Sequence, residues 1–135
     1  MSPVDIALAV LLLVTAVVTV AYWVDFFWHG SVNVVEKDWY IRFERAFPVA
    51  DGFMSASAAV AAIGLLAGAA YGVAWGLVTA GALLFLGLMD VTFNVGNGLY
   101  EHLGRSWPMR AELAINVWCI GFGAALLVVL VNRLG

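Results

Sequence analysis

Four long apolar runs occupy most of this 135-residue chain, and they constrain its fold more than any other feature. A helix needs about 20 apolar residues to cross the hydrocarbon core of a bilayer. Runs of that length lie at about residues 6–27, 49–70, 74–95 and 112–131. Only 11% of the residues are charged, against about a quarter in soluble domains. The sequence therefore predicts an all-α integral membrane protein, a single bundle of four transmembrane helices.

The connections between the runs differ in length, and this difference predicts the orientation. The first and third connections are long, whereas the second is a short piece around residues 68–73. Both long connections then lie on one side of the membrane, and both termini lie on the other. Five of the six basic residues fall in the long connections. The positive-inside rule thus predicts a multi-pass cell-membrane protein with cytoplasmic long connections and both termini outside.

The first long connection has a helical pattern of its own at about residues 34–47. Four apolar residues recur there at every fourth position, which is one face of a helix: Val35, Trp39, Phe43 and Phe47. Charged residues, Glu44 among them, mostly take the other faces. This pattern predicts a short amphipathic helix lying in the membrane interface. The alternative is that the same helix covers a polar site in the bundle.

The second apolar run is rich in small residues. Gly64, Gly68 and Gly72 repeat every four residues, with Ala58 and Ala62 nearby. Small residues at this spacing let helix backbones approach closely in a membrane. We expect this face to pack within the bundle, with a homodimer through the same face as the alternative.

Polar side chains gather at one end of the runs. Asp90, Asn94, Asn97 and Glu101 form a single stripe, provided that the helix continues through two intervening glycines. A charged aspartate at membrane depth costs about 2.5–3.5 kcal/mol, so such a residue faces protein or water rather than lipid. The other three runs place further polar residues at the same end: Tyr22, Asp25, Asp51, Ser55, Glu112 and Asn116.

These residues favour a site for a lipophilic small molecule that enters from the bilayer. Neighbouring buried carboxyl groups can act as general acid and base, which suits isomerase, cyclase or hydrolase chemistry. We assign Asp90 and Glu112 as catalytic, with Asp51 assisting. The expected ligand-binding residues are Asn94, Asn97, Asn116, Ser55, Tyr22, Asp25 and Glu101. The residues leave open whether the protein is an enzyme.

Three alternatives compete with this hypothesis. The carboxyl groups could serve a small proton- or cation-coupled transporter, or the polar groups could only join the helices. A metal site formed by Asp25, His29, Glu101 and His102 is a third alternative, but adjacent residues point apart on a helix, and we expect no metal and no cofactor. The net charge of −3 argues against a nucleic-acid partner. The expected partners are the lipid bilayer and a lipophilic small molecule.

Overall fold

The computed structural model describes residues 1–135, and helices are its only regular secondary structure. The four long helices are α1 (Pro3–Trp28), α3 (Pro48–Leu66), α4 (Ala70–Gly96) and α5 (Trp107–Val131). Two short helices lie in the long connections: α2 (Asp38–Glu44) and the 3₁₀ helix η1 (Leu99–His102). Four segments are long and apolar enough to cross a membrane: α1, α4, α5, and α2 together with α3.

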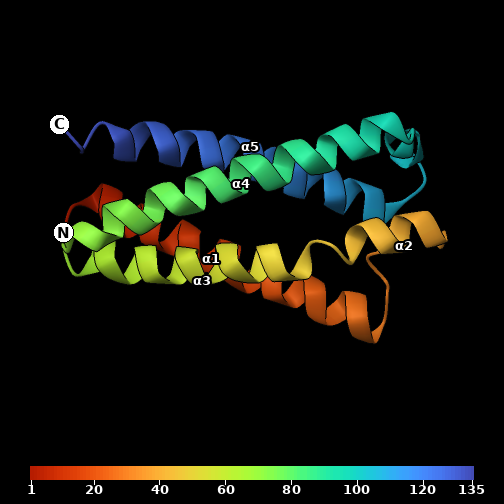
Figure 1. The fold of residues 1–135 in the computed structure, drawn as a ribbon, viewed down its shortest axis with the longest axis horizontal. Coiled ribbons are helices and arrows are strands. Elements are labelled where there is room, and N and C mark those ends of the chain that lie inside the picture. Colours follow the sequence, from red (N-terminus) through yellow and green to blue (C-terminus); the bar gives the residue numbers. More distant parts are fainter.

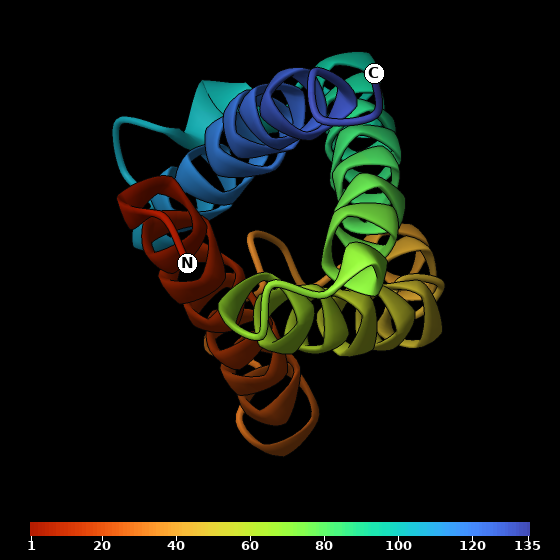
Figure 2. The ribbon, with the colours of Figure 1, turned by 90° about the vertical axis from the view of Figure 1, so that its left-hand side faces the viewer.

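The long helices run side by side, with both termini and the α3–α4 turn at one end (Figure 1). Both long connections lie at the other end, as four successive spans predicted. Seen end-on, the helices stand around a common centre in the order α1, α3, α4, α5 (Figure 2). Along this order α1 packs on α3, α3 on α4, and α4 on α5, but α5 makes no comparable contact with α1. The bundle is therefore closed on three sides and loosely joined on the fourth.

Local sequence signals set the helix ends. Ser2 and Asp5 form a capping box at the start of α1. The Ser106 side chain accepts a hydrogen bond from the Met109 backbone at the start of α5. Proline stands in the first turn of α1, α3 and α5, where its missing N–H costs nothing. Gly68 and Gly98 adopt a φ of +64° just after α3 and α4, a conformation that favours glycine.

These signals correct several predicted boundaries. The second run ends at Leu66 rather than near residue 70, because the positive-φ turn follows directly, and α4 begins at Ala70 rather than residue 74. The cap at Ser106 starts α5 five residues before residue 112. The interfacial helix expected at residues 34–47 is only the seven-residue α2.

The small residues of α3 pack within the chain. A Cβ atom on Gly64 would lie 2.5 Å from the Gly72 Cα atom, which leaves no space for any side chain there. Ala58, Ala61 and Ala62 are fully buried in the same core. Gly68, by contrast, lies in the turn and faces open space. The close approach of α3 and α4 therefore accounts for Gly64 and Gly72, the positive φ of the turn accounts for Gly68, and the homodimer stays a prediction.

The outward faces of the bundle are strongly apolar. Large side chains such as Val17, Phe85 and Val117 are each more than 60% exposed. A soluble monomer rarely exposes such continuous apolar surface. An apolar outer surface of this kind can contact the hydrocarbon core of a bilayer, in agreement with the four candidate membrane spans.

Candidate functional site

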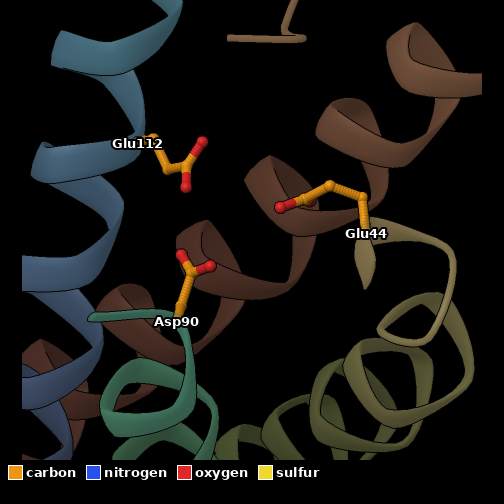
Figure 3. A group of neighbouring side chains, drawn as sticks. All are labelled: Glu44, Asp90 and Glu112. Carbon is orange, nitrogen blue, oxygen red and sulfur yellow. The ribbon is translucent and has the colours of Figure 1, made fainter. Parts of the chain in front are cut away.

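Three carboxyl groups from three helices meet inside the end of the bundle that carries the long connections. Glu44 is the last residue of α2, Asp90 lies in α4, and Glu112 lies in α5. One oxygen atom from each lies within 4.8 Å of the other two. Glu44 is 4% exposed and Glu112 is 3% exposed. Figure 3 shows the three side chains pointing toward a common space.

Two neighbouring side chains hold Glu112 in place. The Asn94 amide donates a hydrogen bond of 2.7 Å to one carboxyl oxygen, and the Tyr40 hydroxyl donates one of 3.2 Å to the other. Asn94 and Tyr40 are both fully buried. Tyr40 also packs on Leu99 and Met109, which attaches α2 to the connection between α4 and α5. Packing of α2 therefore determines where both Tyr40 and Glu44 lie.

A second pair of polar residues lies beside the cluster. The Asn116 amide donates a hydrogen bond of 2.7 Å to the hydroxyl of Tyr100, which lies in η1. The Asn94 amide lies 3.5 Å from the same hydroxyl, at the limit of a hydrogen bond. Tyr100 thus joins η1 to α5 beside the cluster.

The cluster lines a cavity of about 380 Å³ inside the bundle. Asp51 lines the same cavity, and its carboxyl group accepts a hydrogen bond of 2.7 Å from the Trp23 indole. Most of the remaining wall is apolar. A cavity of this volume is the size of a small-molecule site, and an apolar wall with a few polar groups is typical of one.

The mouth of this cavity lies between α1 and α5, two neighbouring helices that do not pack closely. Val14 and Val18 on α1, and Ala114 and Trp118 on α5, line the cavity and are also exposed at the surface. A hydrogen bond of 2.9 Å from the Trp118 indole to the Thr15 hydroxyl joins α5 to α1 along this seam, as we call the line where the two helices face each other. The mouth therefore opens through a side of the bundle and is lined mainly by apolar side chains.

No basic side chain neutralises the cluster. The single ion pair in the chain joins Arg133 to Asp5, near the two termini. Arg110 is exposed and donates instead to the backbone carbonyls of Leu103 and Gly104. Two carboxylates 4.8 Å apart repel by about 3.5 kcal/mol at an effective dielectric constant of about 20. The cluster must therefore carry protons or a cation rather than three unbalanced negative charges.

All three predicted catalytic residues line one cavity, but only two of them belong to the carboxyl cluster. Asp90 and Glu112 lie together, but the third carboxyl group beside them is Glu44 rather than Asp51. The positive end of a helix stabilises a carboxylate in its first turn. Glu112 lies in the second turn of α5, so this effect does not explain why a carboxyl group is buried there. Asp51 does lie in the first turn of α3.

The predicted polar stripe on the third helix ends early. α4 stops at Gly96, and Gly98 turns the chain into η1. Asn97 is exposed and bonds only to the Phe93 carbonyl of its own helix. Glu101 is exposed as well. The structure therefore brings only the first two members of the stripe, Asp90 and Asn94, to the carboxyl cluster.

The other predicted ligand-binding residues divide into two groups. Tyr22 and Asn116 line the cavity. Asp25 accepts hydrogen bonds from Ser31 and from the Val32 backbone, so it orders the loop after α1. Ser55 lines a separate shallow groove on the outer surface of α1 and α3. The alternative metal set gains no support, because Asp25, His29, Glu101 and His102 do not form a cluster.

Sequence reasoning missed two residues of the site, Tyr40 and Glu44. The pattern in this segment placed its apolar positions in the membrane interface and Glu44 on another face, whereas the structure buries Tyr40 and Glu44 and leaves Trp39 45% exposed. The spacing of four residues between Tyr40 and Glu44 was the available signal, since it places both on one helix face. The alternative that this helix covers a polar site fits the structure better than a purely interfacial helix does.

The fold and the site together define a four-helix bundle of membrane-spanning composition, with a carboxyl cluster inside a laterally open cavity. No protein family, curated protein or solved structure matches this chain. A function for it therefore rests on the geometry of its own residues.

Proposed function

We propose that this protein is an integral membrane protein that binds a lipophilic small molecule and carries out acid–base chemistry on it. The observation that carries the proposal is the cavity, which has an apolar mouth between α1 and α5 and carboxyl groups inside. If the four long helices span a bilayer, this mouth faces the hydrocarbon. A lipophilic molecule would then reach the carboxyl groups without crossing water.

The residue roles follow from the contacts. Glu112 accepts hydrogen bonds from Asn94 and Tyr40, so we assign it as the group that takes a proton from the bound molecule. Asp90 lines the cavity beside it and donates a proton to another atom of the same molecule. One proton leaves the substrate and one arrives, so an isomerisation would leave the overall proton count unchanged. Tyr22 and Asn116 line the wall and would orient the substrate.

Transport is less well supported than chemistry. Toward the termini the interior of the bundle is filled by apolar side chains such as Leu12, Leu83 and Leu126, all fully buried. A proton or cation that reached the cluster would meet few polar groups beyond it. These are mainly the hydroxyls of Thr15, Ser57 and Thr79, and each donates to a backbone carbonyl of its own helix. A transporter would need a second conformation that opens this half of the bundle.

The proposal is tested by identifying the molecule that the protein retains. The protein would be purified from membranes in mild detergent, and bound lipophiles would be extracted and identified by mass spectrometry. The loaded protein would then be incubated in D₂O, and deuterium uptake into the bound molecule would be followed. We expect the native chain to retain a lipophile and to exchange its protons, and Asp90→Asn to retain the lipophile without exchange.

Asp38→Asn is the matched control, because Asp38 is an exposed aspartate in α2. It should bind and exchange like the native chain. A native protein that retains no lipophile would contradict the binding function. Exchange that continues at the native rate in Asp90→Asn would contradict the assignment of Asp90.

A further inference from the structure

We propose that Glu44, Asp90 and Glu112 together bind one hard divalent cation of the Mg²⁺ or Mn²⁺ class. This inference rests on the function proposed above and supplies a cofactor for the same site: with Asp90 ionised as a ligand, the ion would take the electrophilic role that protonated Asp90 has in the ion-free cluster. It goes beyond the sequence-based expectation, which contained no metal.

The spacing of the carboxyl oxygens fits such an ion. Three oxygens, one from each residue, lie within 4.8 Å of one another. Oxygen ligands bind Mg²⁺ at about 2.0–2.1 Å and Ca²⁺ at about 2.3–2.6 Å, so two ligands on opposite sides of an ion lie about 4–5 Å apart, and a third ligand lies closer to at least one of them. The three side chains come from separate helices and point toward one space (Figure 3). Side-chain rotations that bring the three oxygens closer together would complete the coordination.

Unpaired oxygen atoms at the cluster are the second observation. One Glu44 carboxyl oxygen has no hydrogen-bond partner, although the residue is only 4% exposed. The Asn94 amide oxygen is also unpaired, in a fully buried residue whose amide nitrogen binds Glu112. Buried polar atoms nearly always have a partner in native proteins. Two unpaired acceptors at the same cluster are open to a donor or a positively charged group, and the proposed ion would supply one.

The donor set selects the class of ion. All three ligands are carboxylates, which suit Mg²⁺, Mn²⁺ or Ca²⁺, whereas softer ions prefer thiolate or imidazole. Cys119 lines the cavity but does not belong to the three-residue group. No lysine or arginine pairs with the cluster, so the ion would supply the missing positive charge. Bound there, it would polarise an oxygen atom of the lipophile.

Mn²⁺ is the probe for the test, because the electron paramagnetic resonance signal of the free ion reports binding directly. The full-length protein in detergent would be stripped with a chelator, desalted and titrated with Mn²⁺. We expect one Mn²⁺ per chain for the native protein and at least tenfold weaker binding for Glu44→Gln. Glu101→Gln is the matched control, since Glu101 is an exposed glutamate at the same end of the bundle, and it should bind like the native chain.

Two results would overturn the inference: no saturable Mn²⁺ binding by the native chain, or unchanged affinity in Glu44→Gln. If Glu44→Gln fails to fold by circular dichroism, Asp90→Asn replaces it with the same expectation. Lipophile retention measured in excess chelator separates this inference from the proposed function. A chain that retains the lipophile but binds no Mn²⁺ refutes the cation alone, whereas a chain that binds Mn²⁺ but no lipophile refutes the proposed function alone.

Discussion

The hydrogen bond from Asn94 to Glu112 makes a prediction that can be worked out from the structure. The donor and acceptor lie 2.7 Å apart and are almost completely buried. Asn94→Ala removes this bond and leaves Glu112 with Tyr40 as its remaining partner. The only other contact of the Asn94 amide nitrogen, to the Tyr100 hydroxyl at 3.5 Å, is too long to contribute much.

The expected magnitude depends on the charge of the acceptor. Hydrogen bonds to charged groups contribute about 1.5–3 kcal/mol in proteins. Side-chain bonds between membrane helices average about 0.6 kcal/mol, with a maximum of about 1.7. A short bond to a buried carboxyl group belongs at the upper end of the membrane range. We therefore expect a coupling energy of about 1.5 kcal/mol, or roughly a tenfold change in the unfolding equilibrium.

A double-mutant cycle isolates this energy. Asn94→Ala, Glu112→Ala and the double variant would be unfolded with increasing sodium dodecyl sulfate in mixed micelles, with helix content followed by circular dichroism. Asn97→Ala is the control, because Asn97 is exposed and bonds within its own helix, and it should change stability by less than about 0.5 kcal/mol. A coupling energy near zero between Asn94 and Glu112 would refute the geometry of the site described above.

Two further predictions concern the packing and the mouth of the bundle. Gly72→Ala places a Cβ atom 2.5 Å from the α3 backbone and should destabilise the bundle by about 1–3 kcal/mol in the same unfolding assay. Gly81→Ala, where the added Cβ meets nothing within 4 Å, should be neutral or slightly stabilising; equal losses would contradict the close α3–α4 packing. Val18→Trp, at the cavity mouth, should reduce lipophile retention at least tenfold. Val17→Trp, on the outer surface of the same helix, should not, and unchanged retention in Val18→Trp would contradict entry through the seam.

Much of the fold could be predicted because it depends on local patterns. Apolar length predicts the long helices, and their even number predicts that both termini lie at the same end. Helix ends were predicted less well, because caps such as Ser106 and positive-φ glycines such as Gly68 act within a turn that the apolar pattern does not show. Asp90 and Glu112 were predicted to form the site because a carboxyl group in an apolar segment needs a protein or water environment.

Glu44 and the lateral mouth could not be predicted in the same way. The sequence shows that α2 is amphipathic but not how far the helix is rotated about its axis when it packs, and that rotation turns Glu44 inward and Trp39 outward. The seam between α1 and α5 is likewise a property of the assembled bundle, since it exists because α5 packs on α4 rather than on α1.

By itself, the sequence determined that four apolar helices form and that their polar residues gather at one end, because both properties follow from the order of residues along the chain. The tertiary structure decided which carboxyl groups come within 4.8 Å and on which side their cavity opens. These properties depend on contacts between residues distant in sequence, where a rotation of one helix exchanges a buried side chain for an exposed one.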